Sequence, residues 1–265
     1  IVNYNLMKKI FLFNLLITIF CSCAYFNTFY NANQYYDEAT KIRLEKDGQA
    51  VPIQAMDKYG KAIEKCMKVL RDFPQSRFYN DAILLMAKAQ YFRSDYSLAL
   101  DNLTEILNNG SENQVEEAKY WQALCKWKKG NLQTSMNELK FLLTNSTSKS
   151  ILSKCHLTLA EISSELINPD SSLFHLKKAA KITQNRDEKG IIYGRLAELA
   201  FDLGQYEIAM NGYSNVVAHS LSKEKIENAH LQMLKILRIQ KNYKLASRKI
   251  KALLADDKFK RISGN

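Results

Sequence analysis

The sequence contains few of the residues that interrupt helices: only three prolines and nine glycines occur among 265 residues. Such a chain lacks the frequent turn signals of β-sandwiches and barrels, which argues against an all-β fold. No stretch is long or biased enough in composition to serve as a flexible linker. With 46% hydrophobic residues, the chain is expected to be an all-α protein with an extensive core.

Catalytic and metal-binding motifs are also missing. The sequence has no glycine-rich phosphate loop, no GxSxG, no HExxH and no paired-carboxylate motif. The four histidines stand apart without the spacing of metal ligands: His156, His175, His219 and His230. We therefore predict that the protein is not an enzyme, binds no metal or other cofactor, and has no small-molecule substrate.

The cysteines form no CxxC pair. Two cysteines, Cys21 and Cys23, lie near the N-terminus, and Cys66, Cys125 and Cys155 follow among apolar neighbours. Cysteines in such surroundings commonly behave as small buried hydrophobes, and this is the interpretation we favour. A disulfide stays open as an alternative in an oxidising compartment, although three cysteines give no complete framework.

Acidic residues are outnumbered, and the formal net charge is +11. Lysines are spread along the whole chain, which favours solvated helix faces over a dedicated site. The densest groups are Lys177, Lys178 and Lys181, and the run from Lys241 to Lys251. The second is a candidate patch for an anionic lipid or an acidic protein.

A small residue recurs at nearly constant spacing. The steps between successive positions are 37, 36, 37, 37 and 37 residues, at Ala62, Ala99, Ser135, Ser172, Ala209 and Ala246. Apolar residues follow four and seven positions later, which places all three on one helix face. A period in this range is typical of stacked-repeat proteins.

Each repeat has the pattern of a helical hairpin. A second small residue lies twelve positions earlier, as Ala87, Ala123, Ala160 and Ala197, with Leu234 as the exception. Turn signals separate the two positions, such as Ser94-Asp95, Gly130-Asn131 and Gly204-Gln205. Each unit is therefore predicted as helix, tight turn and helix, with small residues where the helices cross.

This pattern resembles the tetratricopeptide repeat, a helical hairpin of about 34 residues. The resemblance covers residues 53–254 and implies an all-α, right-handed solenoid of about six helix-turn-helix units. Armadillo and HEAT repeats, at about 40 to 47 residues, fit less well. Residues 47–52 separate an aromatic-rich helix, within residues 23–46, from this solenoid, and residues 255–265 form a polar tail.

The N-terminus resembles a bacterial lipoprotein signal over residues 1–22. Lys8 and Lys9 precede an apolar run from Ile10 to Phe20, and Cys23 follows. That run is too short to span a bilayer, which needs about 20 apolar residues. Met7 is the expected start, which makes residues 1–6 an upstream extension. The alternatives are an ordinary cleaved signal or an uncleaved anchor.

The lipoprotein resemblance implies that Cys23 is lipidated with palmitate and becomes the mature N-terminus. Ala24 follows where an aspartate would favour inner-membrane retention. We therefore expect a protein of the cell outer membrane, lipid-anchored and facing the periplasm. In that compartment its partners are expected to be proteins or peptides of the cell envelope, with no nucleic acid.

Aromatic residues follow the lipidation site directly. Tyr25, Phe26, Phe29 and Tyr30 are the membrane-proximal set, and Tyr35 and Tyr36 extend it. Aromatic rings with polar tips suit a membrane interface, so this segment is a candidate for resting on the bilayer. The competing interpretation is that it packs as a first helix against the solenoid.

In tetratricopeptide arrays the first helix of each hairpin lines an inner groove, and this resemblance implies where partners bind here. Large aromatic and cationic side chains on that face are candidate anchors. The candidates are Lys88, Tyr91, Tyr120, Trp127, Phe201 and Arg238. Tyr120 and Trp127 have core packing as their competing interpretation.

Residues 61–100 resemble lipoproteins of the BamD type, through the Phe73-Pro74-Gln75-Ser76 element and the Ala- and aromatic-rich helix that follows. The element also occurs in the envelope protein that coordinates outer-membrane constriction with peptidoglycan synthesis. The resemblance implies a scaffold that assists outer-membrane protein assembly. The alternatives are a cell-wall or division coordinator that binds peptidoglycan-synthesis or Tol-Pal proteins, and a subunit of a secretion or motility apparatus.

The last repeat has no evident capping helix, although solenoid ends normally carry a polar cap. We therefore predict that the face with Ile250 and Leu253 is thinly covered or used in an interface.

Overall fold

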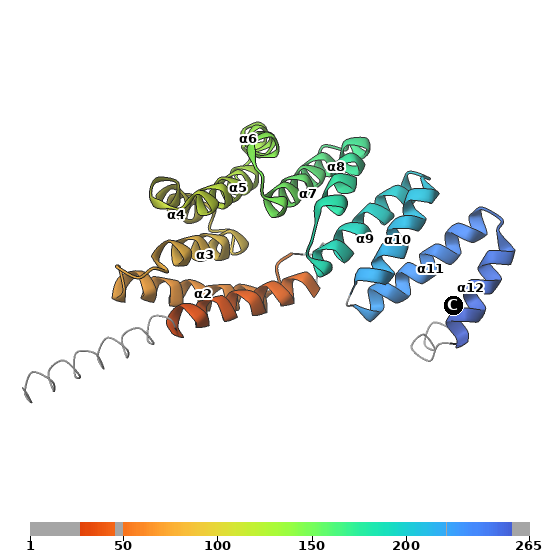
Figure 1. Ribbon diagram of the computed structural model, residues 1–265, viewed down its shortest axis with the longest axis horizontal. Coiled ribbons are helices and arrows are strands. Elements are labelled where there is room, and N and C mark those ends of the chain that lie inside the picture. Colours follow the sequence, from red (N-terminus) through yellow and green to blue (C-terminus); the bar gives the residue numbers. More distant parts are fainter. Residues whose placement is uncertain (1–26, 46–49, 221, 256–265) are drawn as a thin grey trace, which may run out of the picture. The chain divides into compact units, whose positions relative to one another are not determined.

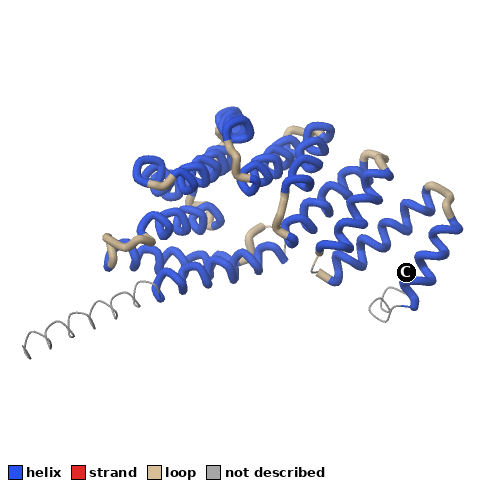
Figure 2. Tube along the Cα trace, viewed as in Figure 1, coloured by secondary structure: helices blue, strands red, loops and turns tan. Residues whose placement is uncertain are grey.

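A computed structural model describes residues 27–45, 50–220 and 222–255 of the chain. Within these ranges every regular element is a helix, and no strand occurs (Figures 1 and 2). The predicted all-α class is confirmed.

The described helices follow one another as hairpins (Figure 1). The first hairpin joins a helix over residues 27–45 to α2 (Ile53–Asp72). The others are α3 (Tyr79–Phe92) with α4 (Tyr96–Asn109), α5 (Glu112–Lys128) with α6 (Leu132–Asn145), α7 (Lys149–Glu165) with α8 (Pro169–Ile182), α9 (Arg186–Asp202) with α10 (Tyr206–His219), and α11 (Lys223–Ile239) with α12 (Tyr243–Ala255). The aromatic N-terminal helix is thus the first helix of the first hairpin.

The turn inside each of the last five hairpins is built in the same way. One residue has a positive φ in every turn: Ser94, Gly130, Ile167, Gly204 and Lys241. The next residue donates its backbone N–H to a carbonyl five positions earlier, as from Asp95 to Gln90 at 2.9 Å and from Gln205 to Ala200 at 2.8 Å. This is the Schellman ending of a helix, which reverses the chain within two residues.

The chain divides into two compact units, residues 1–138 and residues 139–265, with the boundary inside α6. In unit 1, the N-terminal helix packs on α2 and α3. Ala32 of that helix joins a buried cluster with Cys66, Val69 and Ala82, and Phe29 and Tyr36 pack against it. Phe29 also stacks on Phe78, with ring centroids 4.9 Å apart. Packing against the solenoid is therefore what the described part of this segment does.

A second cluster of unit 1 surrounds Tyr59 of α2, whose side chain is fully buried. Its ring stacks on Phe92 at 5.0 Å and meets Tyr36 edge-on at 5.4 Å. The Tyr59 hydroxyl lies 3.1 Å from Thr40 Oγ1 and accepts from Arg43 Nε at 3.4 Å. One side chain thus connects three successive helices.

In unit 2, the small residues lie where helices cross, as predicted. Ala160, Ala197 and Ala209 are buried in one cluster with Leu176, Tyr213 and other apolar side chains. The helices α9 and α10 approach each other closely: a Cβ added to Gly212 would lie 2.8 Å from Ala197 Cβ and 3.1 Å from its Cα. The two backbones can come this close only because both residues are small.

All three described cysteines, Cys66, Cys125 and Cys155, are buried, as expected of small hydrophobes. Burial raises the pKa of the Cys66 thiol to about 12, so that the reactive thiolate is scarce at neutral pH. Among the described residues, no helix has the length and apolar character needed to cross a membrane.

Candidate functional site

The face predicted to bind partners is built from side chains of successive first helices. In unit 1, Lys88 of α3 lies 3.0 Å from Glu117 Oε1 of α5. The Lys88 Nζ also stands 5.4 Å from the ring centre of Tyr36 on the N-terminal helix. Both members of the ion pair are partly exposed, so a charged partner has access to them.

Aromatic rings continue this row of unit 1. Tyr91 of α3 meets Trp121 of α5 edge-on at 5.3 Å, and it also contacts Tyr96 at 5.6 Å. Tyr91 is half-buried, whereas Trp121 is only 6% exposed. Tyr91 therefore keeps part of its side chain exposed beside a buried neighbour.

Two predicted anchors of unit 1 lie inside the molecule. Tyr120 is 6% exposed and Trp127 is 7% exposed. Tyr120 meets Trp121 edge-on at 5.6 Å, and Lys128 Nζ lies 3.5 Å from the ring centre of Trp127. In the described structure these two side chains serve packing within the chain, which was their competing interpretation.

Unit 2 has a row of the same kind. Glu161 of α7 binds Arg195 Nη1 of α9 at 2.5 Å, with both side chains partly exposed. Phe201 of α9 is half-buried, and Lys235 Nζ of α11 lies 4.8 Å from its ring centre. Lys235 and Arg238 are exposed on α11, one turn apart. Their two positive charges beside an aromatic ring suit an acidic or aromatic segment of a partner.

The structure brings together two histidines that the sequence analysis treated as isolated. His156 of α7 and His175 of α8 face each other with their Nδ1 atoms 2.9 Å apart. Both are half-buried. His156 lies four residues before Ala160, and His175 lies three residues after Ser172. The antiparallel hairpin brings these two positions together. Antiparallel register was the signal that could have revealed the pair.

The surroundings of this pair disfavour protonation. Burial lowers the pKa of His156 to about 4, and His175 and Lys178 lower it further by charge repulsion. Burial also lowers the pKa of His175, with a second contribution from Lys140. One ring donates its Nδ1 proton to the other, and the pair is neutral at pH 7.

The histidine pair makes unit 2 sensitive to acid. A histidine whose pKa is lowered on folding contributes stability that is complete above its unfolded pKa of about 6.5 and is lost as the pH falls toward 4. With solvent screening, His156 accounts for on the order of 1 kcal/mol of this loss. We expect His156→Gln/His175→Gln to flatten the fall in unfolding free energy between pH 6.5 and 4, measured by urea denaturation. His219→Gln is the control, and an unchanged profile in the double variant would contradict the assignment.

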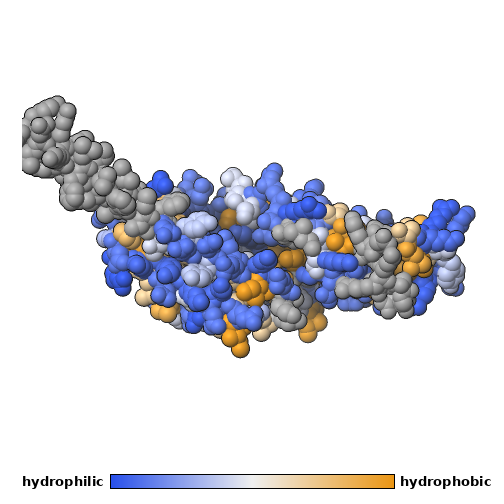
Figure 3. Space-filling view, turned by 90° about the horizontal axis from the view of Figure 1, so that it is seen from below, coloured by the Kyte–Doolittle hydropathy of each residue, from blue (hydrophilic) through white to orange (hydrophobic). Residues whose placement is uncertain are grey.

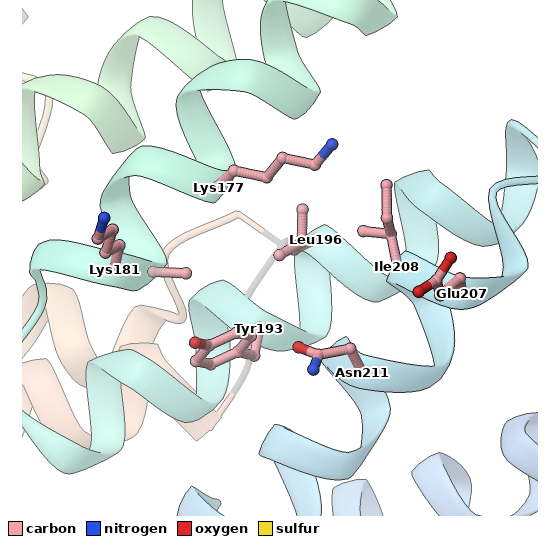
Figure 4. A pocket seen from close by; sticks show the side chains of 8 residues that line it. Lys177, Lys181, Tyr193, Leu196, Glu207, Ile208 and Asn211 are labelled. Carbon is pink, nitrogen blue, oxygen red and sulfur yellow. The ribbon is translucent and has the colours of Figure 1, made fainter.

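A pocket of about 390 Å³ lies in unit 2 among α8, α9 and α10 (Figure 4). It is lined by Lys177, Ala180, Lys181, Tyr193, Leu196, Glu207, Ile208 and Asn211. The spacing of the small residues had not predicted this pocket.

Other predicted positions lie at the edge of the structure. Cys23, Tyr25 and Phe26 are outside the described residues. Tyr30 is 53% exposed, while Phe29 packs inward. The described residues contain no group of three or more His, Cys, Asp or Glu side chains arranged to hold a metal ion.

Solved structures with a similar fold include tetratricopeptide-repeat proteins. The chain is similar to TTC0263, a TPR protein from Thermus thermophilus, with a TM-score of 0.50, 16% identity, and coverage of 78% of this chain and 98% of that one. It is similar to pilF of Pseudomonas aeruginosa, with a TM-score of 0.53, 12% identity, and coverage of 90% and 99%. It also resembles a chain of the Cut9–Hcn1 hetero-tetramer of the APC/C, with a TM-score of 0.51, 13% identity, and coverage of 91% and 46%.

These similarities show the fold: a helical repeat solenoid of the tetratricopeptide kind. No protein-family model matches the sequence, and no curated protein matches it.

Proposed function

We propose that this chain, whose fold is that of tetratricopeptide-repeat proteins, is a scaffold that binds other proteins of a bacterial cell envelope. In this proposal a lipid on Cys23 holds it at the outer membrane, facing the periplasm. The observation that carries the binding role is that, within each unit, ionic and aromatic contacts join successive first helices, as between Phe201 and Lys235.

The unit 2 row supports a specific mode of capture. Phe201 of α9 contacts two neighbouring helices. Lys235 of α11 lies over its ring, and Tyr206 of α10 meets the ring edge-on at 5.8 Å. A ring that is fixed before binding loses little conformational entropy when a partner packs on it. Lys235 and Arg238 then select a segment with carboxylates near an apolar or aromatic side chain.

The lipid anchor would act by position. Fixing the scaffold to a membrane raises the local concentration of its partners there without any additional contact. The N-terminal helix packs on α2 through Ala32 and Phe29, so the attachment point lies directly before a folded element. Assistance to outer-membrane protein assembly, as in BamD-type lipoproteins, is the concrete role we propose.

The test is affinity capture of the lipidated protein from its native envelope, with bound proteins identified by mass spectrometry. We expect Phe201→Ala/Lys235→Glu to lower partner recovery at least tenfold. The matched control is Phe174→Ala/Lys178→Glu, because Lys178 Nζ lies 5.5 Å from the Phe174 ring on the second helix α8, off the row. Equal recovery with both double variants would refute binding through the first-helix row.

The identity of the captured proteins decides the role. The barrel-assembly machinery would support the BamD-type role, whereas Tol-Pal proteins or peptidoglycan synthases would replace it with the coordinator role. Cys23→Ser, with labelled palmitate as the probe, tests the anchor separately. Unchanged labelling in that variant would refute lipidation at Cys23.

A further inference from the structure

The C-terminal hairpin leaves uncovered a position that every earlier repeat buries. Four residues after the small crossing residue, the side chains are buried in five units: Cys66, Leu103, Leu139, Leu176 and Tyr213. The sixth is Ile250, which is 42% exposed. The predicted thin covering of this face is confirmed, and α12 has no fully buried side chain.

The earlier units show what kind of element fits there. Tyr213 and Val216 of α10 share one buried cluster with Ala229, Met233 and Ile236, which lie on the following first helix, α11. Ile250 and Leu253 are the matching positions of α12. A further helix with apolar residues four and three positions apart, like Ala229, Met233 and Ile236, would therefore fit against Ile250 and Leu253.

The uncovered side chains form a continuous stripe. Tyr243, Ile250 and Leu254 are 63%, 42% and 51% exposed. Their spacing of seven and four residues puts them on one side of α12. The least exposed side chains of α12 are Ala246, Lys249 and Leu253, and Lys249 Nζ approaches Met233 Sδ of α11 at 3.9 Å. One side of α12 thus rests on α11, and the three exposed apolar side chains lie next to that side. Apolar residues are visible among hydrophilic ones near the α12 end of the molecule (Figure 3).

A row of positive charge borders the terminal stripe, which we define as Tyr243, Ile250 and Leu254. Lys244, Arg248 and Lys251 are exposed and follow one another at helical spacing. No aspartate or glutamate occurs from residue 228 to residue 255, whereas seven lysines and arginines do. The local field at this end is therefore positive, and it favours an occupant with negative charge.

We propose that the terminal stripe binds an acidic amphipathic α-helix of a partner protein, which lies against Ile250 as α11 lies against Tyr213 of α10. Apolar residues of the partner cover Ile250 and Leu254, and its carboxylates face Lys244, Arg248 and Lys251. A second copy of this chain fits less well, since a symmetric contact would set this basic row against itself. A stripe of three apolar side chains is also narrow for a helix lying in a membrane surface.

The probe is a synthetic peptide, acetylated and amidated, that copies the 17 residues of α11 with every lysine and arginine replaced by glutamate. It keeps Ala229, Met233 and Ile236, which share a buried cluster with residues of α10 within the chain. The matched peptide has the unaltered sequence of α11. Binding to the full-length protein is measured by fluorescence anisotropy, at low and at high salt.

We expect the acidic peptide to bind at least tenfold more tightly than the unaltered one, and more weakly as salt rises. Ile250→Glu/Leu254→Glu should abolish binding. Leu98→Glu, at a 56% exposed position of α4, should leave it unchanged. Because all three positions are exposed, the variants should fold, which circular dichroism checks.

Several results would overturn the proposal. They are equal binding of the two peptides, no binding, or binding that Ile250→Glu/Leu254→Glu leaves intact. If the peptides do not bind, two other occupants can be tested with the same variant. Vesicle binding (phosphatidylglycerol) that Ile250→Glu/Leu254→Glu abolishes would assign the stripe to a membrane. Self-association that this variant abolishes would assign it to a second copy of the chain. Binding that appears only after removal of residues 256–265 would assign it to the chain's own tail. Peptide binding that survives Ile250→Glu/Leu254→Glu but is lost in Phe201→Ala/Lys235→Glu would place the peptide on the unit 2 row. The other results do not bear on capture through Phe201 and Lys235, so the two proposals fail separately.

Discussion

Tyr59→Ala is expected to lower the free energy of unfolding of unit 1 by about 3–5 kcal/mol, the usual cost of removing a large buried aromatic side chain. The Tyr59 ring is fully buried and contacts both Phe92 and Tyr36. Its removal leaves a cavity among three helices that cannot close without moving the N-terminal helix. This loss is a large part of the stability of a typical domain.

The prediction is best measured by hydrogen exchange alongside denaturant unfolding, because the two units need not unfold together. Amide protection over residues 27–45 should fall the most, and protection over α9 and α10 should stay unchanged. Tyr59→Phe keeps the ring and removes the hydroxyl that meets Thr40 and Arg43, at a cost of about 1–2 kcal/mol. Ile53→Ala, at a 78% exposed position, is the neutral control. Equal effects of Tyr59→Ala and Tyr59→Phe would show that the ring does not hold the helices together.

Gly212→Ala is expected to destabilise unit 2 by about 1–3 kcal/mol, although alanine favours helices by about 1 kcal/mol over glycine. The new Cβ would lie 2.8 Å from Ala197 Cβ and 3.2 Å from its backbone nitrogen. Since part of the obstruction is backbone, α9 and α10 must move apart.

Gly194→Ala is the matched comparison on α9. Its new Cβ would find Val216 Cγ2 at 3.8 Å, an ordinary contact, so this variant should gain up to about 1 kcal/mol. Thermal and urea unfolding of the two variants measures the difference. If Gly212→Ala proved as stable as Gly194→Ala, the crossing of α9 and α10 would be looser than described.

The hairpins could be predicted from the sequence because a crossing tolerates only small side chains. Ala99, Ala160 and Ala209 recur for that reason, and each is buried. The turns could be predicted as well, because a left-handed residue must follow the first helix, as at Gly130 and Gly204. Ile167 and Lys241 adopt the same conformation without being glycine. There the turn signals in the sequence are Asn168-Pro169-Asp170 and Lys241-Asn242.

The N-terminal helix escaped assignment to a hairpin for a local reason. Its connection to α2 is longer than the others, and its buried Ala39 does not lie twelve residues before Ala62. The twelve-residue rule describes hairpins with tight turns, and it does not detect the same packing across a longer connection.

The candidate site could be predicted only as a face. Spacing from the small residues selected Lys88, Tyr91 and Phe201, and each of them contacts a neighbouring first helix in the structure. The spacing could not predict which of these side chains would be buried, because burial depends on the residues of the next helix. Tyr91 is partly covered by Trp121 of α5, whereas Trp127 is buried.

The uncovered end of α12 also bears on how long the protein survives in a cell. In a repeat array each hairpin is stabilised by its neighbours, and α12 packs on α11. Without a single fully buried side chain, α12 should open first among the described helices. Proteases act on such opened segments, so degradation would begin there and proceed hairpin by hairpin. Occupancy of this one helix would then determine the turnover of the whole chain.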